Sequence, residues 1–161
     1  MTAGDPVQWA VGVVRVQLPP GQSLEQRDGI ARWSPDSDAG AFTVVSGSPE
    51  DGGADELLAA ERAGAQDVEV ECDEETVRGG LPVRHTRYRT RRHTPRVVLA
   101  GGARGARHAG DEDVSSCNEF LFVADGERLV RVGYSVLADA PAGVREALQS
   151  VFDGVRIGDE R

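Results

Sequence analysis

The chain has 161 residues, 39% of them hydrophobic, and a formal net charge of −9. This length suits one domain with its own core, and the acidic balance disfavours a generic binder of nucleic acids or anionic membranes. No apolar run approaches the ~20 residues of a membrane span.

The first part of the chain predicts three short strands and a helix. The β-branched run at 11–20 is closed by prolines and glycine, so it predicts the first strand. Residues 30–33 predict a second strand and residues 41–47 a third, each followed by turn-forming residues. Acidic residues then precede apolar residues at helical spacing, which predicts a helix over 54–65.

Two alternating runs on either side of Gly79 and Gly80 predict a β-hairpin. The first run carries a carboxylate at every second position, and the second is rich in arginine. With a three-residue turn, the expected cross-strand pairs are Glu75–His85, Asp73–Arg87, Glu71–Arg89 and Glu69–Arg91 on one face, and Val70–Thr90 and Cys72–Tyr88 on the other. Each exposed charge pair contributes roughly a few tenths of a kcal/mol, but we expect the array to fix the alignment of the strands.

The last part of the chain predicts a loop, a second hairpin and a helix. Residues 95–116 are rich in glycine and arginine and predict a long irregular loop. Two β-rich runs follow, joined by Asp125-Gly126, a pair that suits a type I′ turn. A helix is expected from Pro141 to Gly154, and residues 155–157 predict a short closing strand. The order of elements predicts an α+β fold: a single-domain antiparallel sheet flanked by helices over residues 1–161.

Four pieces of the sequence resemble the PsbP-like superfamily. They are VRVQLPPG for a strand followed by LP-x-G, RGGLPVRHTRY for a glycine step into a strand, FLFVADGERLVRVGYSV for two strands with a polar turn, and FDGVRI for the ending after the final helix. The superfamily includes the photosystem II extrinsic subunit, Ran-binding Mog proteins, actinobacterial lipoproteins and Eag-type chaperones of secreted effectors. The resemblance implies a PsbP-like sandwich that binds a protein or hydrophobic partner without catalysis.

The sequence lacks the motifs of common enzymes. All 18 basic residues are arginine, which excludes a P-loop lysine, a Schiff-base lysine and an SxxK nucleophile. Cys72 and Cys117 form no CxxC pair, so we expect two free thiols. His85 and His93 would lie roughly 26 Å apart on one strand, too far to share a metal. We therefore expect no catalytic residue, no metal site and no cofactor.

Basic residues outside the charge pairs are the candidates for binding a partner. Residues 84–108 contain eight arginines, three histidines and no acid. The candidates in and after this strand are Arg92, Arg96, Arg104, Arg107 and His108. Arginine binds carboxylates and phosphates through its planar fork, although a solvated loop paired to the acids at 111–113 is an equal alternative. Trp33 is a further candidate contact, with core packing as its alternative.

The leading hypothesis is a non-enzymatic protein-binding, adaptor or chaperone-like module in a secretion-related or regulatory setting. We expect it in the cytoplasm, because the N-terminus lacks the basic start of a signal peptide. One alternative is a small ligand-binding domain or enzyme with a pocket between sheet and helices that uses Tyr88, His85 or Glu119. A third hypothesis is nucleic-acid binding through the arginine-rich strand.

Overall fold

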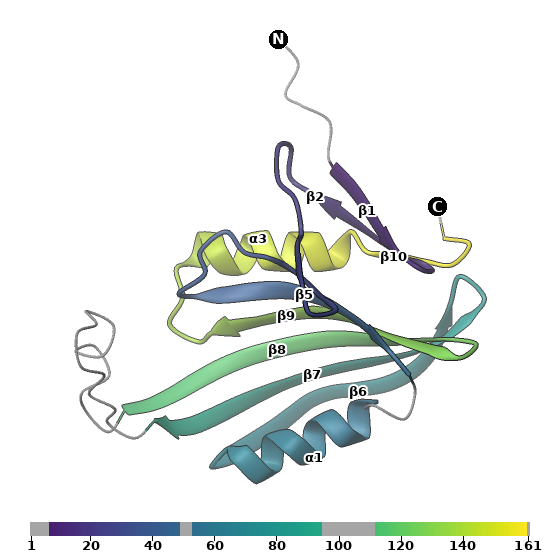
Figure 1. Ribbon diagram of the computed structural model, residues 1–161. Coiled ribbons are helices and arrows are strands. Elements are labelled where there is room, and N and C mark those ends of the chain that lie inside the picture. The colour runs from purple at the N-terminus through teal and green to yellow at the C-terminus, as the bar shows by residue number, and fades with distance from the viewer. Residues whose placement is uncertain (1–6, 49–52, 95–111, 161) are drawn as a thin grey trace.

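The computed structural model describes residues 7–48, 53–94 and 112–160, which form two antiparallel β-sheets and two helices (Figure 1). The larger sheet has seven strands in the order β3-β4-β5-β9-β8-β7-β6. They are β3 (Glu25–Arg27), β4 (Ile30–Trp33), β5 (Gly40–Gly47), β6 (Asp67–Arg78), β7 (Leu81–Thr94), β8 (Glu112–Asp125) and β9 (Arg128–Leu137). The smaller sheet, in the order β1-β2-β10, contains β1 (Val7–Val11), β2 (Val14–Leu18) and β10 (Arg156–Ile157). The helices are α1 (Ala54–Gly64) and α3 (Ala142–Asp153).

The two helices pack on opposite faces of the larger sheet (Figure 1). Leu148 of α3 belongs to a core that includes residues of β5, β9 and the smaller sheet. Leu58 of α1 packs with Tyr88 and Phe122 in a second core. Side chains alternate along a strand, so Leu121 and Phe122, neighbours on β8, belong to different cores. The predicted α+β class with antiparallel sheets is confirmed.

The predicted first strand at 11–20 contains the turn and the second strand of an N-terminal hairpin, whose first strand, β1, lies mostly before it. Gly12 and Val13 form the turn between β1 and β2, and Gly12 has a φ of 55°, a conformation that favours glycine. The valines on both sides make this turn look like a continuous strand. The short strand β3 was not predicted, although Asp28 and Gly29 form the turn after it with φ of 54° and 78°. Asp-Gly is a strong signal for such a type I′ turn.

Strands β6 and β7 form the predicted hairpin in a different register. The turn contains only Gly79 and Gly80, with φ of 56° and 82°, instead of three residues. A β-bulge at Glu71 adds a second shift, so none of the six expected pairs are direct cross-strand neighbours. The two charged rows still meet, because Arg89 Nε donates a hydrogen bond of 2.8 Å to Glu71 Oε1.

Strand β8 begins earlier than predicted. Its first residue, Glu112, is the cross-strand neighbour of Thr94 on β7, so residues 112–116 belong to a strand and not to a loop. Strand pairing across the sheet stabilises this segment, and a local pattern does not report such pairing. The remaining part of the predicted loop, 95–111, lies outside the described residues.

The predicted hairpin of β8 and β9 is confirmed, with a different turn. The turn residues are Gly126 and Glu127, and of the two only Gly126 has a positive φ, of 57°. This is typical of a type II′ turn and not of type I′. Helix α3 follows Pro141, and β10 confirms the closing strand. No helix in the described part of the chain is long and apolar enough to cross a membrane.

Candidate functional site

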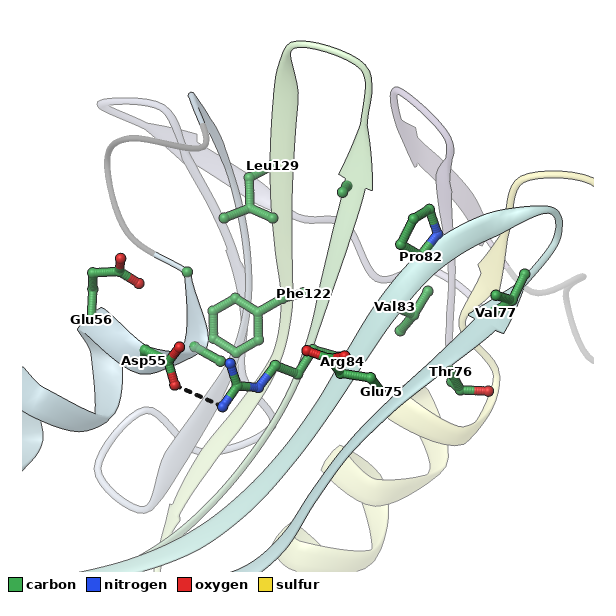
Figure 2. Close-up of a pocket in the computed structure, with 13 residues that line it drawn as sticks. Asp55, Glu56, Glu75, Thr76, Val77, Pro82, Val83, Arg84, Phe122 and Leu129 are labelled. Carbon is green, nitrogen blue, oxygen red and sulfur yellow. Dashed lines mark hydrogen bonds and ion pairs between the residues drawn. The ribbon is translucent and has the colours of Figure 1, made fainter.

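An apolar pocket opens between the start of α1 and the closed end of the β6–β7 hairpin (Figure 2). Its volume is about 530 Å³, within the range of ~300–1,000 Å³ that is common for ligand sites. The first turn of α1, the ends of β6 and β7, and the residues of β8 and β9 next to their turn all line it. These segments are distant in the sequence, and the larger sheet brings them together.

The walls of this pocket are mainly apolar side chains. Phe122 of β8 and Leu129 of β9 lie on one side, and Val77 and Pro82 of the hairpin lie on the other (Figure 2). Val77 and Pro82 are cross-strand neighbours at the end of the hairpin. Val77 is 70% exposed, the highest value among the large hydrophobic residues of the described chain. Pro82 is exposed as well, and neighbouring exposed apolar side chains often mark a binding site.

Charged side chains surround the pocket, and most of them are acidic. Asp55, Glu56 and Glu75 contribute carboxylates, and Arg84 contributes the guanidinium. Arg84 donates hydrogen bonds of 2.8 Å to Asp55 and, through two nitrogens, to Asp73. These bonds hold the pKa of both aspartates below the usual range and raise the pKa of Arg84. Because Arg84 is already paired to two carboxylates, the rim carries excess negative charge.

A second polar cluster lies on the α3 face of the larger sheet. His85 Nε2 lies 2.6 Å from Glu119 Oε2, and Tyr134 Oη lies 2.9 Å from Glu119 Oε1. The side chain of Glu119 is only 5% exposed. Burial, together with the charge of Glu119, raises the pKa of Tyr134. Phe152 of α3 packs against this cluster, with ring centroids 5.9 Å from His85 and 5.7 Å from Tyr134.

The three polar residues proposed for an enclosed pocket do not converge as a group. His85 and Glu119 are in contact on the α3 face, whereas Tyr88 is 1% exposed in the core under α1, on the opposite face. The contact of Tyr134 with Glu119 was not predicted, because the register of β8 and β9 decides it. No group of three or more His, Cys, Asp or Glu side chains that could hold a metal ion exists among the described residues.

The candidate binding residues from the sequence have different positions. Arg92 Nη2 donates a hydrogen bond of 2.6 Å to Glu61 Oε2 and thereby joins β7 to α1. Trp33 is 6% exposed, and its indole N–H donates to Gln22, so it packs in the core. Arg96, Arg104, Arg107 and His108 lie outside the described residues.

Comparisons with known proteins identify the fold. No protein-family model matches the chain, and no curated protein matches its sequence. The chain is similar in structure to the cyanobacterial PsbP (CyanoP) from Synechocystis sp. PCC 6803, with 12% identity and a TM-score of 0.55 over 98% of this chain and 95% of that chain. It is also similar to the Ran-binding protein Mog1p from Saccharomyces cerevisiae, with 13% identity and a TM-score of 0.52 over 97% of each chain. The protein therefore has the PsbP/Mog1-like fold.

Proposed function

We propose that this protein is a non-enzymatic adaptor that binds a protein partner, and that the pocket of Figure 2 receives an apolar segment of that partner flanked by arginine or lysine. The observation that carries the proposal is an exposed apolar pocket with an acidic rim. Apolar walls supply binding free energy, and charges at the rim select among partners.

The apolar part of the proposal depends on Val77, Phe122 and Leu129. Covering an exposed valine completely contributes ~1.5–3 kcal/mol. Because Val77 is 70% exposed, most of this gain is still available to a partner. An apolar side chain that enters the pocket would also contact Leu129 and Phe122, which line it from the neighbouring strands.

The charged part of the proposal favours a basic partner segment. Asp55, Glu56 and Glu75 outnumber Arg84 around the pocket, and Asp73 also pairs with Arg84. A second copy of this chain is a poor occupant, because each copy carries a net charge of −9. Basic residues beside an apolar anchor would gain from the same field, and this gain decreases as salt screens it.

The fold likeness supports a protein partner. One of the two compared structures is Mog1p, a protein named for binding Ran. The basic residues Arg96, Arg104, Arg107 and His108 are proposed as an additional contact with acidic groups of the partner. Arg92 is a weaker candidate for this role, because it is paired with Glu61.

Isothermal titration calorimetry with two synthetic peptides tests the proposal. The peptides have the same central leucines and valines, flanked by arginines in one and by glutamates in the other. We expect the arginine peptide to bind more tightly and to lose affinity as salt is raised. In Val77→Ser we expect a loss of about 1–2 kcal/mol, or roughly 5- to 30-fold in Kd, because the exposed valine can no longer be buried.

Val70→Ser is the matched control for this titration. Val70 is also on β6 and is 36% exposed, but it does not line the pocket. Equal losses in Val70→Ser and Val77→Ser, or equal affinities for the two peptides, would contradict the proposal. A dimer in solution that Val77→Ser dissociates would show instead that a second copy occupies the pocket.

A further inference from the structure

The β-bulge at Glu71 decides which face of the larger sheet Cys72 occupies. Before the bulge, Val70 pairs with Tyr88, whose side chain lies under α1. Side chains two residues apart share a face, so an unbroken ladder would place Cys72 on that α1 face as well. The extra residue makes Cys72 the neighbour of Arg87 instead, on the α3 face.

On the α3 face, three polar groups lie side by side in a row that begins with the thiol of Cys72. Cys72 Sγ lies 3.7 Å from His85 Nδ1, within reach of a thiol hydrogen bond. The other ring nitrogen of His85 lies 2.6 Å from Glu119 Oε2. Tyr134 Oη lies 2.9 Å from the second oxygen of Glu119, and Phe152 packs against the imidazole. The bulge and the cross-strand pairing therefore align a thiol, an imidazole and a buried carboxylate.

A thiol, an imidazole and a carboxylate in this order form the arrangement in which a base activates a nucleophile. A thiol reacts as the thiolate, and a histidine that accepts its proton needs a third group to orient the ring and stabilise the imidazolium. Glu119 is suited to that role, because its side chain is 5% exposed and it contacts His85 directly. The sequence alone predicted two ordinary free thiols and gave no reason to join Cys72 to His85.

The environment of Cys72 makes the base necessary. Partial burial and the nearby carboxylate of Glu74 raise the pKa of the Cys72 thiol. Few molecules therefore carry a free thiolate at neutral pH, and reaction depends on proton transfer. The titratable and charged groups around the thiol and the imidazole are Asp73 and Glu74 of β6, Arg87 of β7, Glu119 of β8, Tyr134 of β9 and, through Gln149, Asp153 of α3.

We propose that Cys72 is a reactive thiol that exchanges with small neutral disulfides, with His85 as the base and Glu119 as its positioning residue. The proton of Cys72 moves to His85 Nδ1, and the thiolate sulfur attacks one sulfur of the disulfide. A new S–S bond to Cys72 forms as the S–S bond of the reagent breaks. The leaving thiolate takes the proton from His85, so the products are a mixed disulfide at Cys72 and one small thiol. This site lies on the face opposite the pocket and does not depend on the proposed partner binding.

The test measures the rate of reaction of Cys72 with 4,4′-dithiodipyridine, followed by the absorbance of the released pyridinethione. All variants carry Cys117→Ser, so that Cys72 is the one thiol in the chain. At neutral pH we expect His85→Asn and Glu119→Gln each to lower the rate constant at least tenfold. At a pH high enough to deprotonate the thiol without a base, we expect the rates of His85→Asn and the parent to converge.

This convergence separates a base from a residue that only supports the structure. A rate in His85→Asn that equals or exceeds the parent rate at neutral pH would overturn the proposal. A rate that stays equally reduced at high pH would also overturn it, because the change would then concern access to the thiol. If Glu119→Gln does not fold, Tyr134→Phe replaces it, with a smaller loss expected because the carboxylate keeps its contact with His85. Mass spectrometry of the product locates the mixed disulfide.

Discussion

Replacing Arg84 with methionine should lower the stability of the protein and change its dependence on pH. Arg84 donates two hydrogen bonds of 2.8 Å to Asp73 on β6 and one of 2.8 Å to Asp55 on α1, as Figure 2 shows for Asp55. It therefore joins the helix to the hairpin beside the pocket. Methionine keeps most of the apolar stem and removes all three bonds.

The size of the stability loss in Arg84→Met follows from the exposure of the three side chains. Asp55 is 78% exposed, so its bond to Arg84 is screened by water and contributes little. The side chains of Arg84 and Asp73 are 23% and 33% exposed, and their two charge-assisted bonds form a fork. After allowance for solvent screening, we expect Arg84→Met to cost about 1–2 kcal/mol at neutral pH. Asp55→Asn should have a much smaller effect and serves as the control.

The effect of pH has a defined sign. Arg84 holds the pKa of Asp73 and Asp55 below the values of the unfolded chain. Carboxylates with a lowered pKa stabilise the fold above their unfolded pKa of ~4, and this contribution is lost as the pH falls through the folded pKa. The difference between the parent and Arg84→Met should therefore be largest at neutral pH and decrease below about pH 4.

Urea unfolding, followed by tryptophan fluorescence at neutral pH and near pH 3, measures this difference. A free energy of unfolding for Arg84→Met that equals the parent value at neutral pH would refute the reasoning. An equal loss at both pH values would refute the assignment of the loss to the ion pairs, because these pairs weaken when the carboxylates are protonated.

Two further predictions concern the glycines of two hairpin turns and the arginine-rich strand. A Cβ added at Gly79 would lie 1.8 Å from the carbonyl oxygen of Ile157, whereas one at Gly126 would meet nothing within 4 Å. We expect Gly126→Ala to lower the free energy of unfolding by about 1–2 kcal/mol, because of the positive φ alone, and Gly79→Ala to lower it clearly more. Equal losses in urea unfolding would contradict the close contact between Gly79 and Ile157. Because Arg84, Arg89 and Arg92 are already paired with carboxylates, we expect elution from heparin at low salt, and retention at high salt would favour nucleic-acid binding.

Local sequence patterns predicted most of the secondary structure because strands and turns leave clear signals. Alternation identified β6 and β7, and β-rich runs ended by turn residues identified β4, β5, β8 and β9. Gly79-Gly80 and Asp125-Gly126 indicated two turns. Asp28-Gly29 carried an equally good signal for a turn. In the N-terminal hairpin, Gly12 lies within a run of valines, and the pattern there is the same for one strand as for two.

The register and the sites required information that a local pattern does not contain. The bulge at Glu71 has no signature in its residue types, yet it moves Cys72 to the face of His85. The contact between His85 and Glu119 depends on how β8 aligns with β7, and many alignments are compatible with the long segment that separates the two strands. The pocket is still harder to predict from the sequence, because its walls come from five elements.

We propose above that the pocket beside Val77 binds an apolar segment of a protein partner that is flanked by basic residues. Photo-crosslinking in the native host tests it most directly, with p-benzoylphenylalanine in place of Val77 and, separately, in place of Val70. Mass spectrometry then identifies the crosslinked segment of the partner. We expect crosslinks from position 77 to one segment with apolar residues and neighbouring arginine or lysine, and few from position 70. Crosslinks of equal yield from both positions, or to an acidic segment, would contradict it.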